Sequence, residues 1–159
     1  MSNYSEAIEA MNDLIQINND RIAGYERAIE HIRASNDHSG LSSFQKYLDD
    51  SRQFIRDLTQ EVQQMGGTPA DSSTVGGKVH RFWMDIKNTF SSDEKVKESA
   101  LESCVFGDDA AIKSYEAALA DSTNGFSMAQ TVLLNSQLAS IRIARQANKI
   151  YERVEDAMN

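Results

Sequence analysis

Three polar side chains interrupt otherwise apolar helical patterns, and they are the residues of this sequence best placed to do chemistry. Asn18 and Asp108 each stand in the middle of a row of apolar residues spaced three and four apart, and Ser51 interrupts another such row. A buried amide or carboxylate must find partners, because an unsatisfied buried polar group costs about 1 to 3 kcal/mol. Tyr25 and Tyr115 stand on the same rows, and a buried phenol also seeks a hydrogen-bond partner. We therefore predict that these five residues form a polar core layer.

A carboxylate at mid-helix also raises the question of a metal site. Oxygen ligands suit hard cations, so Asp108 with Glu102 or Glu116 and water is a candidate set for iron or manganese. The usual di-iron bundle uses Glu-x-x-His pairs, but none of the three histidines here has a glutamate three positions before it. We favour the interpretation in which Asp108 is hydrogen-bonded to Asn18 and a tyrosine hydroxyl and fixes the register of the helices, with no cofactor. A third interpretation is a small ligand cavity lined by the layer.

A second motif, His80-Arg81-x-Trp83, follows a stretch rich in glycine and serine. His80 and Arg81 can bind an anion at a helix start, but helix capping and surface ion pairs are commoner roles for such residues. No Ser, His and Asp arrangement supports nucleophilic catalysis. We predict no catalytic residue in this sequence.

Helical periodicity predicts the elements that position these side chains. The first two segments carry matched rows joined by a short turn. Facing residue numbers in these rows sum to a constant, from Ile32 with Leu41 to Ile8 with Met65, as an antiparallel hairpin requires. Gly24 and Gly107 stand mid-helix, where glycine costs about 1 kcal/mol relative to alanine, and this indicates a close helix approach or a local bulge. We expect one domain over residues 1–159 with helices at about 4–35, 41–65, 93–121 and 127–157, and a crossover at 66–92 carrying a short helix at about 78–90.

The sequence contains a weak internal repeat with an offset of ninety residues. The offset places Asn18 on Asp108 and Tyr25 on Tyr115, together with several apolar positions of the first and third helices. Two hairpins related by an approximate two-fold axis follow from this match. A bundle of this kind needs a long crossover, because its second and third helices run parallel. The fourth helix has no assignable inner face beyond Ile141.

Several short motifs resemble an uncharacterised bacterial family of four-helix-bundle proteins, a domain of unknown function placed in the ferritin-like superfamily. The resemblance covers nearly the whole chain and implies a fold, an all-α ferritin-like four-helix bundle, but no activity. Members often carry an acidic residue two positions before the glycine matched by Gly107, where this chain has Val105. The matching motifs are Ile17-Asn18-Asn19-Asp20, Gly24-Tyr25, Gly66-Gly67-x-Pro69, His80-Arg81-x-Trp83 with Lys87, and Gly107-Asp108-Asp109 with Tyr115.

Composition limits the classes of partner. The net charge of -8 repels phosphate backbones and anionic headgroups, so we expect neither nucleic acid nor membrane as a partner. The single cysteine, Cys104, excludes an intrachain disulfide and suits a reducing cytoplasm. Tyr4, Tyr47 and Phe54 lie near or beside the apolar rows, and if exposed they favour self-association. We expect a cytoplasmic, non-enzymatic bundle with a structural or protein-interaction role, one interpretation being a role in stress, with a metal-binding bundle as the alternative.

Overall fold

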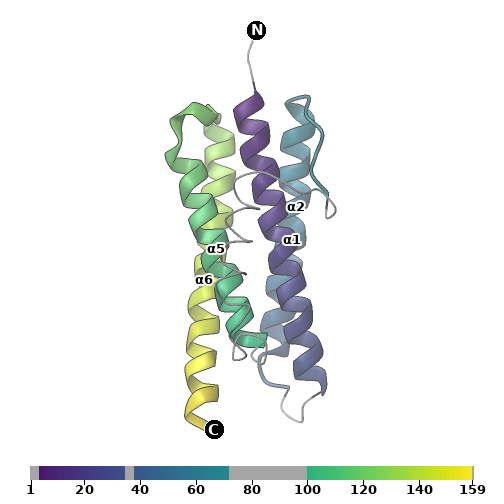
Figure 1. The fold of residues 1–159 in the computed structure, drawn as a ribbon, viewed down its shortest axis with the longest axis vertical. Coiled ribbons are helices and arrows are strands. Elements are labelled where there is room, and N and C mark those ends of the chain that lie inside the picture. Colours follow the sequence, from purple (N-terminus) through teal and green to yellow (C-terminus); the bar gives the residue numbers. More distant parts are fainter. Residues whose placement is uncertain (1–3, 35–37, 72–99, 159) are drawn as a thin grey trace, which may run out of the picture.

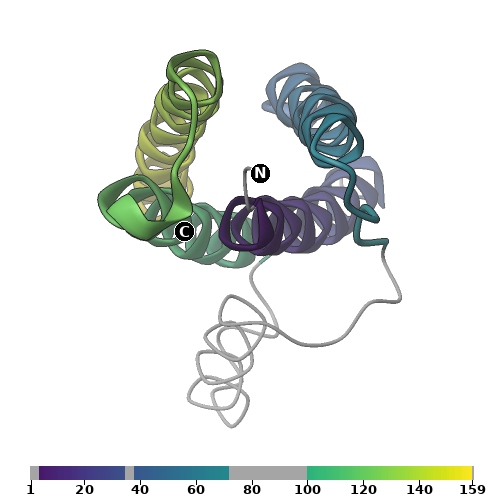
Figure 2. The same cartoon turned by 90° about the horizontal axis from the view of Figure 1, so that it is seen from above.

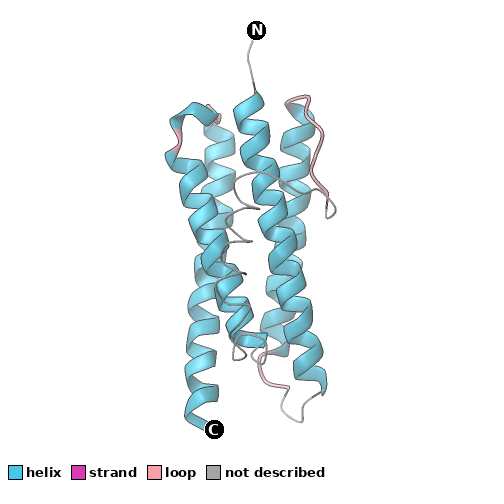
Figure 3. Cartoon of the chain, in the orientation of Figure 1, coloured by secondary structure: helices cyan, strands magenta, loops and turns pink. Residues whose placement is uncertain are grey.

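The computed structural model describes residues 4–34, 38–71 and 100–158, and within these ranges every regular element is helical (Figure 3). The predicted short helix at about 78–90, the first residues of the third predicted helix, and His80, Arg81 and Trp83 lie outside the described residues. The elements are α1 (Ser5–Ala34), α2 (Leu41–Gln64), α5 (Ala100–Ala120), a single 3-10 turn η1 (Ser122–Asn124) and α6 (Met128–Met158).

The four helices form two hairpins, α1 with α2 and α5 with α6, which pack together through α1 and α5. Figure 1 shows that α2 and α5 run in one direction and α1 and α6 in the other, so the parallel pair is the one joined by the long connection. Seen from above, α1 and α5 lie in the middle, while α2 and α6 flank them (Figure 2). The prediction of two hairpins in an all-α chain is confirmed.

Local sequence explains how the second hairpin turns. Asn124 donates its side-chain amide to the carbonyl of Ala118 at 2.8 Å, and Gly125 adopts a positive φ of 62° that glycine tolerates. Ser127 then caps α6, because its hydroxyl accepts from the backbone N–H of Gln130 at 3.1 Å while the Gln130 side chain accepts from the N–H of Ser127 at 3.0 Å. This reciprocal capping box starts α6 at Met128.

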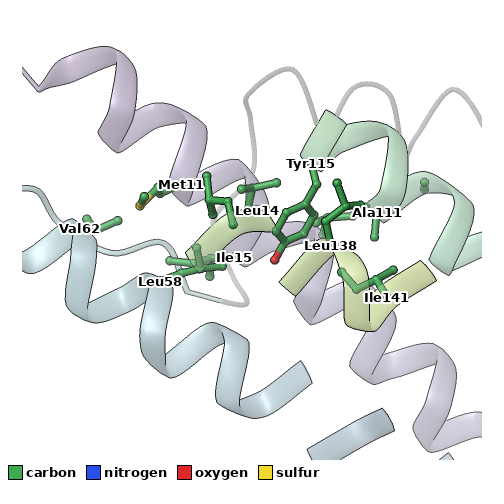
Figure 4. Packing of buried hydrophobic residues seen from close by; sticks show 12 residues of the cluster. Met11, Leu14, Ile15, Leu58, Val62, Ala111, Tyr115, Leu138 and Ile141 are labelled. Atoms are coloured by element: carbon green, nitrogen blue, oxygen red, sulfur yellow. The ribbon is translucent and has the colours of Figure 1, made fainter. Parts of the chain in front are cut away.

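The apolar rows meet between the helices as the hairpin pattern predicts. Ile15 lies with Leu58 and Met11 faces Val62 between α1 and α2 (Figure 4). On α5 the buried side is rotated from the predicted row, because Cys104 and Ala111 are buried whereas Ile112 and Leu119 are only partly so. The inner face of α6, unassigned from sequence beyond Ile141, continues through Ala144 and Asn148.

Gly24 does not mark the close helix approach or bulge expected from sequence. The α1 helix is continuous from Ser5–Ala34, and a Cβ atom added to Gly24 meets no neighbouring atom within 4 Å. The helix therefore tolerates this glycine without using its small size.

Exposed large hydrophobic side chains are concentrated on α6. Tyr4 is 46% exposed, as expected, but Tyr47 and Phe54 are half-buried and pack against the core, contrary to the expectation that they stay exposed. The four positions that we call the outer stripe are all on α6: Met128, Val132, Ile143 and Ile150. Among the described residues, no helix is both long enough and apolar enough to cross a bilayer.

Candidate functional site

An ion pair between Arg21 of α1 and Asp108 of α5 lies at the centre of the bundle. The Nε atom of Arg21 lies 3.0 Å from Oδ1 of Asp108, and the two side chains are 2% and 0% exposed. The paired charges are cut off from water, so removing one partner would leave the other as a buried uncompensated charge. The pair ties the two hairpins together at the point where α1 and α5 meet.

Two further donors converge on the same carboxylate. The hydroxyl of Tyr25 lies 3.0 Å from Oδ1 and 2.9 Å from Oδ2 of Asp108. The side-chain amide of Asn148, on α6, donates to Oδ2 at 3.0 Å and to the Tyr25 hydroxyl at 2.8 Å. Asp108 thus accepts hydrogen bonds from three side chains on two other helices, an arrangement that suits the ionised carboxylate.

The other side of the guanidinium extends the network to α2. Nη1 of Arg21 donates to the Ser51 hydroxyl at 2.9 Å and to the side-chain oxygen Oδ1 of Asn18 at 3.2 Å. The Ser51 hydroxyl in turn donates to the carbonyl of Tyr47 at 2.9 Å. The guanidinium also lies 5.6 Å from the centre of the Tyr25 ring, within the range of a cation–π contact. Ser51 is therefore an acceptor for a buried cation.

A second arm of the network runs from Asn18 to α6. The Asn18 amide donates to the Tyr115 hydroxyl and to the carbonyl of Leu14, both at 2.9 Å, and the Tyr115 hydroxyl donates to Oε1 of Gln137 at 2.5 Å. The Nε2 atom of Gln137 is buried and has no hydrogen-bond partner among the described residues. Within the described part of the chain, the arm thus ends on an amide nitrogen whose two hydrogens have no acceptor.

Burial and pairing shift the pKa values of the ionisable groups. Burial, the largest single effect, opposes the charge of Arg21, but the Asp108 carboxylate together with Tyr25 and Tyr115 outweighs it, and the pKa of the guanidinium is raised. Burial also raises the pKa of Asp108, against the opposing effects of Arg21 and of the hydrogen bonds from Tyr25 and Asn148. Arginine stays protonated in proteins, and the ionised form of Asp108 is the one that pairs with it and accepts from all three donors.

The buried phenols and the thiol hold their protons. Burial, and then the charge of Asp108, raise the pKa of Tyr25 far above its ordinary value, and burial does the same for Tyr115. Burial likewise raises the pKa of the Cys104 thiol, whose Sγ lies 3.8 Å from the carbonyl oxygen of Gly24. A protonated, buried thiol is a poor nucleophile, and a neutral phenol is a donor rather than a base.

The predicted polar core layer is present as a hydrogen-bonded network. All five predicted residues belong to it, and sequence reasoning missed three more: Arg21, Gln137 and Asn148. The spacing of Arg21 indicates its place in the network, since it stands three positions after Asn18 and four before Tyr25 on the same face of α1.

The described residues do not fit the metal site considered from sequence. The cation beside Asp108 is already the guanidinium of Arg21, and both carboxylate oxygens accept hydrogen bonds. Glu116 is exposed on the surface, where it pairs with Arg142 at 3.1 Å, so it is removed from the candidate ligand set. The side chain of Glu102 lies outside the described part of the molecule. In that part no group of three potential ligands among His, Cys, Asp and Glu gathers.

A cavity between α1 and α5 lies away from the network. Its walls include Leu14, Lys113 and Ser114 and the acidic residues Glu6 and Glu9. None of the residues of the hydrogen-bonded network lines it. The idea of a ligand cavity lined by the polar core layer is therefore not supported by this cavity.

Comparison with known proteins identifies a family to which no activity is assigned. A family model described as "Domain of unknown function (DUF2383)" matches residues 6–121, which include α2, α5 and all of α1 after its first residue. No curated protein and no solved structure gives a match.

Proposed function

We propose, from the premise that the chain belongs to the DUF2383 family of unknown function, that it is a non-enzymatic protein-interaction module. The observation that carries this proposal is the outer stripe of α6. Its four members are 84%, 64%, 65% and 54% exposed, in chain order from Met128 to Ile150. Several large apolar side chains exposed on one side of a helix are typical of a protein-binding surface.

The internal chemistry of the bundle supports a structural use of the polar network. Asp108 accepts from three side chains, so its carboxylate is already engaged, and Tyr25 and Tyr115 hold their protons, so neither phenol serves as a base. Single buried polar groups are known to fix the register of packed helices. In this proposal the Arg21–Asp108 pair sets the register of the two hairpins and thereby holds α6 in place.

We place the bundle in a ferritin-like frame as part of the same proposal. The support is the parallel direction of α2 and α5, the ninety-residue repeat and the central carboxylate. In this frame the guanidinium of Arg21 takes the place that a metal cation has in di-iron bundles. Elemental analysis of protein purified without chelators tests this part. We expect substoichiometric metal, whereas stoichiometric iron or manganese that disappears in Asp108→Asn would overturn it.

The interaction role is tested by cross-linking in the source cells. We expect the wild-type chain to be captured in a discrete covalent complex that Ile143→Glu abolishes, because a charge in the middle of the outer stripe opposes burial. Gln60→Glu is the matched control, since Gln60 is exposed on α2 and the change adds the same charge. If all three chains give the same complexes, or none, the interaction role is wrong.

A further inference from the structure

We infer that the outer stripe of α6 binds the outer stripe of a second copy of this chain, with the two α6 helices antiparallel. This inference rests on the proposed function and names its partner. With 3.6 residues per turn, the four stripe positions share one side of α6, about half a turn away from the buried side that carries Leu138 and Ile141. The stripe therefore faces away from the bundle that the described helices form.

Two members of the stripe occupy equivalent positions when α6 is reversed. An axis of symmetry through position 141 pairs Val132 with Ile150 of the second copy, and Ile150 with its Val132. The same register pairs the exposed Ala139 with Ile143, so a small side chain receives a large one near the axis. A two-fold interface requires such reciprocal pairing, because the same patch serves both partners.

Two exposed polar residues that lie between the stripe positions obey the same register. Ser136 and Gln146 are both exposed on this side of α6, and the axis at position 141 sets them opposite each other. Polar therefore meets polar, and large apolar meets apolar, at each of these three levels of the interface.

The charges on α6 favour the antiparallel direction. The first half of the helix, from Met128 to Ile141, carries no charged residue, whereas Arg142, Lys149 and Arg153 stand beside the stripe in the second half. A parallel pair would set Lys149 beside its own copy. The reversed pair sets it beside the uncharged half of the partner, and Arg142, nearest to the axis, already has its charge paired with Glu116.

The interface is one helix wide on each side, and its stripe is about 33 Å long at 1.5 Å per residue. Such a contact belongs to the small class of interfaces below about 1,200 Å², so the dimer should dissociate on dilution. Sedimentation equilibrium of the purified wild-type chain over a wide concentration range tests this. We expect the average mass to rise from one chain to two, Gln60→Glu to behave alike, and Ile143→Glu to stay monomeric at every concentration.

Disulfide trapping tests the direction. We expect Val132→Cys and Ile150→Cys chains to form a disulfide-linked dimer when they are mixed and oxidised, but not when each is oxidised alone; the wild-type chain, whose Cys104 is buried, is the control. Dimers of each variant alone would show a parallel pair and overturn the inference. A wild-type chain that stays monomeric at all concentrations overturns it too, and leaves the proposed function standing if cross-linking captures another protein through Ile143.

Discussion

The hydroxyl of Tyr25 lies 2.9 Å and 3.0 Å from the two carboxylate oxygens of Asp108, joining α1 to α5. Ninety positions away from each of them, the Tyr115 hydroxyl lies 2.9 Å from the amide of Asn18, joining α5 back to α1. The internal repeat thus pairs its own polar residues across the bundle. The symmetry ends at Arg21, whose counterpart at the same offset is Ala111, so one of the two arms holds a charge and the other does not.

The ion pair should dominate the stability of the bundle. Asp108→Asn is expected to cost about 3 to 5 kcal/mol, because it leaves the Arg21 guanidinium buried without its anion. The double variant Arg21→Met with Asp108→Asn should cost less than the sum of the two single variants, since the two residues are coupled. Denaturant unfolding of the wild type, the two single variants and the double variant measures this.

The surface pair of Arg142 with Glu116 provides the control for this measurement. Its side chains are 53% and 52% exposed, so Arg142→Met should change the free energy of unfolding by at most about 1 kcal/mol. If Asp108→Asn costs no more than Arg142→Met, the central pair does not behave as a buried one.

The buried phenols make the fold sensitive to alkaline pH. In the folded chain the pKa values of Tyr25 and Tyr115 are raised by burial, whereas the unfolded chain releases these protons at about pH 10. The folded state therefore binds more protons above that pH, and stability, fully present below it, falls as the pH rises further. We expect phenolate absorbance to show both tyrosines titrating only as the chain unfolds.

Phenylalanine variants separate this effect from general alkaline damage. Tyr25→Phe and Tyr115→Phe each remove one of the two phenols. Above about pH 10, each variant should therefore release one proton fewer on unfolding than the wild type, and its free energy of unfolding should fall less steeply with pH. Equal slopes in the wild-type and variant chains would contradict the assignment.

Cys104 should report on the separation of α1 from α5. The thiol is buried, its pKa is raised by burial, and its Sγ lies 3.8 Å from the Gly24 carbonyl. A thiol reagent should modify it slowly in the native chain and rapidly in denaturant, because the reactive thiolate forms only after exposure. We expect Asp108→Asn to speed native-state modification. Rapid modification of the wild-type chain would show that this level of the bundle is open.

We predict that alanine substitutions at two glycines change the stability of the chain in opposite directions. Gly24→Ala should stabilise the chain by about 0.5 to 1 kcal/mol, because a Cβ there meets nothing within 4 Å and alanine is the better helix former. Gly67→Ala should destabilise it, because a Cβ there would lie 2.8 Å from Cγ2 of Ile8. Thermal unfolding of the two variants beside the wild type measures both signs. The same sign for both would contradict the packing described here.

The sequence by itself determined the helices, their hairpins and the existence of a polar level at mid-bundle. Helical periodicity is a local property, and each row of apolar residues needs a partner row, so the pairing of Ile15 with Leu58 could be predicted from spacing. Asn18 and Asp108 were predictable for the same reason, because a polar residue inside an apolar row must be buried with it.

Only the tertiary structure decided which polar groups meet. The spacing of Arg21 fits the face of Asn18 and Tyr25, but a charge on a helix is usually solvated, and nothing local shows that an anion from a helix far away in the sequence will meet it. Asn148 and Gln137 lie on α6, where polar residues at inner positions obscured the apolar row. The ion pair forms because the packing of α1 against α5 excludes water from both charges at once, and that exclusion is a property of the assembled bundle.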